Sequence, residues 1–303
     1  MSVEESETHV TLIDTKDPTT RVEILKFGAN IISWKIHGVE QLWLSEAAKL
    51  DGTKAVRGGI PLVFPVFGKC ADESHPTFNL PQHGFARNST WEFLGKTSES
   101  PTTVQFGLGP ENVDPELYKK WGQGSYDFTL LLTIALDSNK LTTSIDVVNT
   151  GREAFEFNWL FHTYYKIPDI TEAMVSNLVD QNVHDKIIKS RYQEKSPVIQ
   201  FHGELDRVYE DVSESKLIQI IHQGKVLFNL ERSGLPDAVV WNPWIEKSKG
   251  MGDFEPKDGY QNMVCVEPGY VSKFVKLEPS KQWNATQTMY TGGEIKIQSN
   301  IFQ

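Results

Sequence analysis

Residues 155–165, with the sequence FEFNWLFHTYY, contain a histidine that could transfer protons from a rigid position. Apolar residues alternate at 155, 157, 159 and 161, which is the period of a β-strand with one buried face. The opposite face of such a strand would carry His162. A histidine held on a strand is well placed for general acid–base catalysis. A buried histidine bonded to a backbone carbonyl is the plainer alternative.

Residues 263–269, with the sequence MVCVEPG, place a carboxylate directly after an apolar run. We expect the strand to end at Glu267, because a Pro-Gly break follows it. Burial at the end of an apolar strand would raise the pKa of this carboxyl group toward the range of a useful base. A solvent-exposed strand end is the plainer alternative.

Two segments rich in glycine and proline carry polar and cationic side chains. The first, VRGGIPLVFP at 56–65, places Arg57 before two glycines, whose backbone amides can approach a ligand closely. The second, LPQHGFARN at 80–88, contains three polar side chains of different chemistry: Gln82, His83 and Arg87. Both segments suit loops that contact a polar ligand. A tight turn into a buried segment and a solvated loop are the respective alternatives.

The elements that must position these side chains are mostly β-strands. Runs of Val, Ile, Thr, Phe, Tyr and Trp with a period of two are separated by short turn-forming links. The runs 22–27 and 31–36 predict a hairpin. The runs 129–136 and 141–148 flank a turn-rich link, and the runs 217–222 and 226–230 flank Gln223-Gly224. Further strands are expected at 239–241, 263–266 and 283–290.

Helical patterns are few and short. Single helical turns are predicted at Glu46–Leu50 and Asp114–Trp121. Strands and helices do not alternate, so a doubly wound parallel sheet is not expected. No long Pro/Gly/Ser-rich stretch divides the chain. The sequence therefore predicts an all-β protein, a large antiparallel β-sandwich with few short helices, built as one domain over 1–303 with a core of about 20–292.

Taken together, the motifs resemble the aldose 1-epimerase (galactose mutarotase-like) family, in the expected order from about residue 22 to residue 290. The resemblance rests on PQHGFAR at 81–87, WLFHTY at 159–164, ELDRVY at 204–209 and EPG at 267–269. Two further segments are similar to the branch that acts on hexose 6-phosphates, the glucose-6-phosphate 1-epimerases: RGGIP at 57–61 and VWNPW at 240–244. The implied fold is a supersandwich, with the site in a cleft on one sheet.

The resemblance implies mutarotation, the interconversion of α and β anomers through opening of the sugar ring between C1 and O5. A base must take the O1 proton and an acid must protonate the ring oxygen. The family pattern assigns Glu267 as the base and His162 as the acid, with the roles reversed on ring closure. We expect nearby carboxylates to keep the imidazole protonated. The reaction requires no metal and no other cofactor.

The resemblance also implies contacts with the sugar. His83 matches a histidine that hydrogen-bonds the sugar, and Asp206 matches an acidic residue that binds sugar hydroxyls. We further expect Trp241 or Trp244 to offer an apolar surface to the C–H side of the ring.

The overall charge makes a local cationic group necessary if the ligand is a phosphate. The chain has 40 Asp and Glu against 30 Lys and Arg, a net charge of −10. Such a composition argues against a nucleic-acid partner and against recruitment to anionic membranes. The resemblance supplies Arg57 and Arg87, with Gln82 beside them, and guanidinium groups can bind phosphate oxygens in pairs. The expected partner is therefore a small molecule, a hexose 6-phosphate.

The sequence also bears on where the protein acts. No apolar run approaches 18 residues, so no membrane-spanning helix is expected. The acidic segment 1–14 lacks the apolar stretch of a signal peptide. Two cysteines, Cys70 and Cys265, cannot form a disulfide framework and fit a reducing compartment. We therefore expect a cytoplasmic protein, and a monomer because no exposed apolar stripe is evident.

Four alternatives remain at this stage. A non-catalytic carbohydrate-binding module on the same fold would need no acid–base pair, and a free-aldose 1-epimerase would need no phosphate-binding arginines. A glycoside hydrolase would use Asp206 and Glu267 as its two carboxylates. A metal site could combine His83, His162 and Glu267, although their scattered spacing gives it no support.

Overall fold

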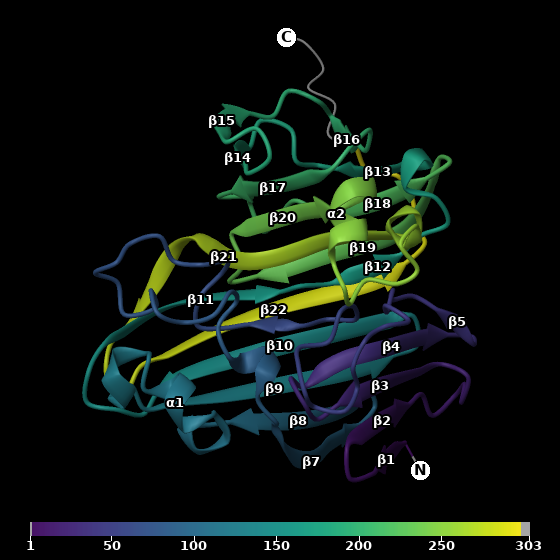
Figure 1. Ribbon diagram of the computed structural model, residues 1–303. Coiled ribbons are helices and arrows are strands. Elements are labelled where there is room, and N and C mark those ends of the chain that lie inside the picture. The colour runs from purple at the N-terminus through teal and green to yellow at the C-terminus, as the bar shows by residue number, and fades with distance from the viewer. Residues whose placement is uncertain (1, 298–303) are drawn as a thin grey trace.

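The computed structural model describes residues 2–297, and it is built almost entirely of antiparallel sheets (Figure 1). Strand alternation explains why these segments form sheets. In β9 (Phe128–Asp137) and β10 (Lys140–Asn149), buried residues alternate with exposed or half-buried ones. The two strands pair from Asp137↔Lys140 onward, across the predicted tight turn. The predicted hairpin forms as β3 with β4, and the strand-like runs at 217–222 and 226–230 pair as β18 with β19. The predicted all-β fold is confirmed.

The largest sheet has nine strands, in the order β16-β13-β18-β19-β22-β10-β9-β8-β7. The bounds not yet given are β7 (Glu92–Glu99), β8 (Thr102–Leu108), β13 (Ala173–Ser176), β16 (Val198–Gln200), β18 (Ile218–His222), β19 (Lys225–Ser233) and β22 (Gln282–Thr291).

A second sheet has eight strands, in the order β15-β14-β17-β20-β21-β11-β6, with β12 paired to β21 beside β11. Its strands are β6 (Leu62–Val63), β11 (Phe155–Phe161), β12 (Tyr164–Lys166), β14 (Asn182–Asp185), β15 (Ser190–Gln193), β17 (Leu205–Glu210), β20 (Asp237–Asn242) and β21 (Met263–Leu277).

A smaller sheet of five strands comes from the N-terminal part of the chain and pairs in sequence order. Its strands are β1 (Val3–Glu5), β2 (His9–Ile13), β3 (Arg21–Leu25), β4 (Asn30–Ile36) and β5 (Val39–Glu40). It lies beside one end of the two larger sheets (Figure 1).

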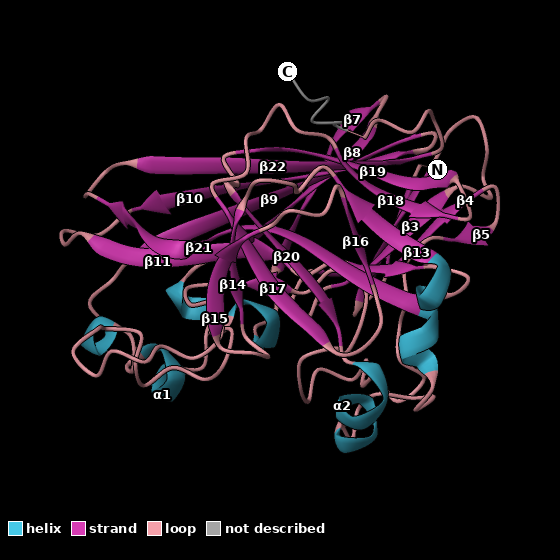
Figure 2. Ribbon diagram, turned by 90° about the horizontal axis from the view of Figure 1, so that it is seen from above, coloured by secondary structure: helices cyan, strands magenta, loops and turns pink. Residues whose placement is uncertain are grey.

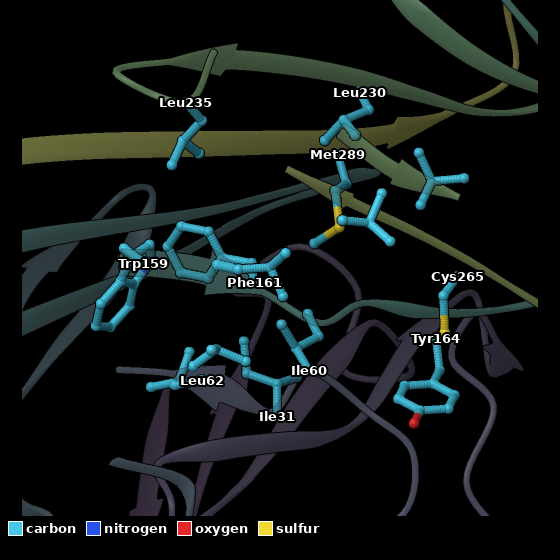
Figure 3. Packing of buried hydrophobic residues seen from close by; sticks show 14 of the residues in the cluster. Ile31, Ile60, Leu62, Trp159, Phe161, Tyr164, Leu230, Leu235, Cys265 and Met289 are labelled. Carbon is cyan, nitrogen blue, oxygen red and sulfur yellow. The ribbon is translucent and has the colours of Figure 1, made fainter. Parts of the chain in front are cut away.

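The two large sheets form layers, with α2 and long loops on the outer side of the eight-stranded sheet (Figure 2). Between the layers, Leu230 and Met289 of the nine-stranded sheet lie over Phe161 of the other (Figure 3). Each such buried side chain contributes about 1.5–3 kcal/mol. The same buried cluster includes Trp34 of the five-stranded sheet. This shared core supports our proposal of one domain, although residues 1 and 298–303 lie outside the described chain.

The helices match the sequence only in part. α1 (Pro115–Tyr118) lies within the predicted turn at 114–121, and Asp114 caps it by accepting a hydrogen bond from the Leu117 N–H at 2.9 Å. The helical turn predicted at 46–50 is wrong. There the Glu46 N–H donates to the Glu255 carbonyl at 2.8 Å, so a tertiary contact takes the backbone out of a helix.

A second helix, α2 (Trp244–Gly250), was not predicted. The Asn242 side chain accepts a hydrogen bond from the Trp244 N–H at 2.9 Å, directly after β20, and so starts the helix. The remaining helical turns are short 3₁₀ segments: Ala86–Asn88, Pro110–Asn112, Gly122–Gly124, Ile170–Glu172 and Gly259–Asn262. Among residues 2–297, no helix has the length and apolar character needed to cross a membrane.

Candidate active site

The strand that carries Glu267 lies inside the eight-stranded sheet. β21 pairs with β20 on one side and with β12 and β11 on the other. Directly opposed residues of antiparallel strands face the same side of a sheet. The register opposes Val239 to Glu267 and Trp241 to Cys265, while Asp206 on β17 opposes Trp241 in turn. These five side chains therefore share one face of the sheet, the face covered by α2 and the loops.

Glu267 does not end its strand, contrary to the sequence-based prediction. β21 continues through Pro268 and Gly269 to Leu277. At this point the pairing of β21 passes from β12, at Cys265, to β11, at Gly269. Proline is tolerated at such a change of partner, because it brings no N–H that a ladder must satisfy. Strand residues therefore precede and follow Glu267, which fixes the position of its backbone.

His162 lies in the short link between β11 and β12. Its backbone N–H donates to the Pro61 carbonyl at 2.9 Å, which ties the link to the loop before β6. The imidazole stacks on the Tyr164 ring at 4.8 Å, and it meets the rings of Trp241 and His83 edge-on at 5.9 and 5.8 Å. The ring is therefore fixed by aromatic neighbours on three sides.

The His162 and Glu267 side chains form a buried contact. His162 Nδ1 lies 3.3 Å from Glu267 Oε1, with the two side chains 11% and 2% exposed. Within residues 2–297, neither His162 Nδ1 nor Glu267 Oε2 has a hydrogen-bond partner. This geometry disfavours the alternative of a histidine bonded through Nδ1 to a backbone carbonyl.

The surroundings disfavour charge on both groups. Burial raises the pKa of Glu267 well above its ordinary value, and the nearby Asp206 raises it further. Burial lowers the pKa of His162 well below its ordinary value, and Arg57 and Arg87 lower it further. The lowered pKa of His162 is contrary to the expectation that nearby carboxylates keep the imidazole protonated. Burial therefore favours the uncharged imidazole and the uncharged carboxyl group over their charged forms.

A cavity of about 310 Å³ opens above this pair, at the lower end of the range for small-molecule sites. Its lining combines aromatic, cationic and acidic side chains: Arg57, Phe67, Gly68, Gln82, His83, His162, Lys186, Asp206, Val239, Trp241, Lys247, Met251 and Glu267. Trp244 is not among them, and its ring packs instead on Tyr260 at 5.4 Å. The sequence analysis expected either Trp241 or Trp244 to face the sugar, and Trp241 is the one that lines the cavity.

His83 contributes a neutral imidazole to the cavity wall. Burial first, and then the charge of Arg87, lower the pKa of His83 well below its ordinary value. Its Nδ1 accepts a hydrogen bond from the Gly68 N–H at 3.2 Å. A neutral ring that accepts at Nδ1 carries its proton on Nε2, and that atom lies 3.3 Å from Gln82 Nε2.

The two arginines differ in their surroundings. Arg57 lines the cavity, donates to both Asp253 carboxylate oxygens at 3.3 and 3.4 Å, and donates to the Tyr164 hydroxyl at 3.1 Å. Arg87 is not among the lining residues and donates to the Gln82 carbonyl at 2.8 Å. Burial lowers the pKa of Arg87 to about 10, and within the described chain its Nε has no partner. Arg87 thus remains a cation without a carboxylate hydrogen bond.

Two lysines of the cavity were missed by the sequence reasoning. Lys186 Nζ lies 3.2 Å from Asp206 Oδ1 and 4.2 Å from the centroid of the Phe67 ring. Lys247 on α2 lies 3.0 Å from Glu204. No local motif marks either residue. Lys186 follows β14, and only the pairing of β14 with β17 brings it next to Asp206.

A model of the aldose 1-epimerase family matches residues 11–290 of the chain. The chain belongs to this family.

Relatives agree with this assignment over most of their length. A Cenchrus ciliaris protein named "Putative glucose-6-phosphate 1-epimerase" is 35% identical over 288 residues, which cover 90% of this chain and 84% of that relative. An Escherichia coli protein of the same name is 32% identical over 281 residues, which cover 92% and 89% of the two chains.

Solved structures share the fold. The crystal structure of a Salmonella typhimurium protein described as "a putative mutarotase" is 26% identical and superimposes with a TM-score of 0.79. The match covers 96% of this chain and 92% of that one. A Synechocystis structure with 18% identity superimposes with a TM-score of 0.77, covers 97% and 98% of the two chains, and shows the same fold.

As an aldose 1-epimerase family member, the protein is an isomerase that acts on a small carbohydrate. Seven of the eight site residues predicted from the sequence line the one cavity, the exception being Arg87. The family resemblance in the sequence is therefore confirmed, while the role of each residue stays a prediction.

Proposed function

We propose that this protein is a hexose-6-phosphate mutarotase that interconverts the α and β anomers of glucose 6-phosphate. The observation that carries the proposal is the buried His162–Glu267 contact of 3.3 Å at the floor of a cavity that Arg57 and Lys186 also line. The names of the Cenchrus ciliaris and Escherichia coli relatives support the choice of substrate.

In the proposed reaction, the Glu267 carboxylate takes the proton from the O1 hydroxyl. The C1–O5 bond breaks, O1 becomes the aldehyde oxygen, and the His162 imidazolium gives its proton to O5. Rotation about C1–C2 then presents the other face of the aldehyde, and the reversed transfers close the ring. Each positioned proton transfer is typically worth 10²–10⁴-fold in rate.

The resting pair already contains the proton that this reaction needs. Moving one proton from Glu267 to His162 converts the neutral pair into the reactive carboxylate and imidazolium without exchange with solvent. The positive charges of Arg57 and Arg87 oppose this transfer, because they lower the pKa of His162. A phosphate dianion bound near them would offset these charges and favour it. We therefore propose that the phosphate group supports the chemistry as well as the binding.

Exchange NMR at anomeric equilibrium tests the proposal. The rate of α/β interconversion of glucose 6-phosphate is measured with and without protein, and free glucose and galactose are measured alongside. We expect clear acceleration for the phosphate and weak or absent acceleration for the free sugars. Acceleration of free sugars alone would contradict the phosphate assignment. Binding without acceleration of any of them would favour a carbohydrate-binding module.

A further inference from the structure

Cys265 lies near the His162–Glu267 pair but does not line the cavity, and the proposed reaction gives it no role. It is a buried free thiol. It precedes Glu267 by two positions on β21, so the two side chains share a face. In the sheet it lies between Trp241 on β20 and Tyr164 on β12. A thiol is therefore built in beside the proton-transfer pair.

We propose that His162, Cys265 and Glu267 form a binding site for a thiophilic divalent cation such as Zn²⁺, and that the bound ion inhibits the enzyme. One ligand atom from each residue lies within 4.8 Å of the other two. The His162 Nδ1 to Glu267 Oε1 distance is 3.3 Å. With zinc–ligand bonds of about 2.0–2.3 Å, tetrahedral ligand atoms are about 3.3–3.8 Å apart. Each separation in the trio therefore has to shorten by at most about 1.0–1.5 Å.

Two of the three groups have coordinating atoms that nothing else uses. Among the described residues, His162 Nδ1 and Glu267 Oε2 are buried and without a hydrogen bond. Buried polar atoms without partners are uncommon and costly, so each calls for a physical explanation. Coordination of one cation would satisfy both atoms at once.

The donor set selects the kind of ion. A thiolate with an imidazole and a carboxylate is typical of zinc, whereas Mg²⁺ and Ca²⁺ prefer oxygen ligands alone. Binding releases the Cys265 thiol proton and the Glu267 proton to solvent, and the two negative charges then match the dication. The adjoining cavity leaves room for a water as the fourth ligand.

The location predicts inhibition. A cation on His162 and Glu267 occupies the lone pairs that the proposed reaction uses for proton transfer. The ion and the sugar phosphate should therefore compete for the site. This inhibitory effect rests on the proposed function, whereas the binding of the ion does not.

Binding is tested on the full chain with Co²⁺ as a spectroscopic probe and with Zn²⁺ in calorimetry. We expect one ion per chain and a sulfur-to-cobalt charge-transfer band. Cys265→Ser should remove the band and weaken zinc binding by at least about 10–100-fold, the loss that even outer partners of a metal site produce. Cys70→Ser is the matched control, because Cys70 is the other cysteine of the sequence. This variant should change neither the charge-transfer band nor the affinity for zinc. Loss of the band in Cys70→Ser instead, or unchanged zinc binding in Cys265→Ser, would overturn the proposal.

Competition in the unmodified protein provides a measurement that does not depend on the variant's folding. Glucose 6-phosphate should suppress the cobalt band as its concentration rises, and Zn²⁺ should raise the apparent KM of the mutarotase. A band that substrate does not affect would overturn the location. A band in a protein without mutarotase activity would leave the metal site standing and contradict the proposed function. Mutarotase activity without a cobalt band and without zinc binding would contradict the metal site and leave the proposed function standing.

Discussion

At the floor of the cavity, His162 Nδ1 lies 3.3 Å from Glu267 Oε1, and neither side chain has much contact with water. Burial favours the uncharged form of both groups. Because the neutral pair and the charged pair hold the same number of protons, a change in local potential is enough to exchange them. The uncharged form is the less costly of the two, because both groups are buried.

Replacing either member of the pair tests its role. We expect His162→Asn and Glu267→Gln each to lower the turnover of glucose 6-phosphate by ~10²–10⁴-fold, because each removes one proton transfer. Binding of the substrate should persist. His37→Asn and Glu116→Gln, whose side chains are 81% and 79% exposed, are the matched controls. Turnover by NMR and binding by calorimetry decide the outcome, and near-normal turnover in both active-site variants would rule out the acid–base assignment.

The two arginines should distinguish phosphorylated from free sugars. We expect Arg57→Ala and Arg87→Ala each to lower kcat/KM for glucose 6-phosphate by ~10–150-fold, which corresponds to charged hydrogen bonds of about 1.5–3 kcal/mol. Residual turnover of free glucose should change far less. Arg191→Ala, at a side chain that is 62% exposed, is the control. Equal losses on both substrates would refute the phosphate assignment.

If phosphate also shifts the proton within the pair, it should act without being attached to the sugar. We expect phosphite dianion to stimulate the turnover of free glucose, because it can offset the charges of Arg57 and Arg87 that disfavour the imidazolium. The stimulation should disappear in Arg57→Ala. The anomerisation rate of free glucose is measured at increasing phosphite concentration and constant ionic strength. Inhibition without any stimulation would contradict an effect of the bound dianion on proton transfer within the pair.

At the scale of elements, two loops and the central strands build the site together. The loop at 80–88 carries His83, and Gly84 forms a bridge to Phe64 at the end of the 56–65 segment. Gly84 has φ +68°, and an added Cβ would lie 2.1 Å from the Phe64 carbonyl oxygen. The Phe85 N–H donates to the same oxygen at 2.9 Å. Gly84 therefore lets the two loops meet closely enough to bring His83 to the cavity.

Substitution at this junction should damage both stability and substrate binding. We expect Gly84→Ala to lower the free energy of unfolding by about 2–4 kcal/mol, from backbone strain and overpacking together. KM for glucose 6-phosphate should rise because His83 moves. Gly203→Ala, where an added Cβ meets nothing within 4 Å, should change stability by less than about 0.5 kcal/mol. Urea unfolding curves compare the two, and similar small losses would contradict the proposed role of the junction.

On the scale of the whole molecule, a chain of net charge −10 has to attract a dianion by local means. Much of the positive charge at the cavity is already balanced, since Arg57 is paired with Asp253 and Lys186 with Asp206. Arg87 has no such carboxylate hydrogen bond, because its described donor contact goes to a backbone carbonyl. The positive charge of Arg87 therefore lies next to the cavity, beside Gln82, without a carboxylate hydrogen bond to balance it.

The site should also reduce global stability in a pH-dependent manner. The pKa of Glu267 is raised in the folded state above its ordinary value of 4.5. Between these two pKa values the folded protein binds more protons than the unfolded chain, so the free energy of unfolding falls as pH rises. Glu267→Gln removes this penalty. We therefore expect the variant to be more stable than the parent protein, by a margin larger at pH 8 than at pH 5. Thermal unfolding at both pH values checks the sign, and a margin that shrinks with pH would contradict it.

Many of the strands, and seven of the residues that line the cavity, were predictable from the sequence. Alternation at 129–136 and 141–148 predicts β9 and β10, because the direction of successive side chains along a strand is a local property of the backbone. The family motifs identified His162, Glu267 and five further cavity residues from their order in the chain. The strand end at Glu267 was wrong, because Pro268 also fits where a strand changes partners.

Tertiary structure alone decided the state and the surroundings of those residues. The pKa of His162 is lowered by burial and then by Arg57 and Arg87, and the pKa of Glu267 is raised by burial and then by Asp206. The presence of Lys186 in the cavity, and of Cys265 beside the pair, depends on how separate strands align. A pKa and a contact distance arise from groups far apart in the chain, and pairing and packing are what bring those groups together.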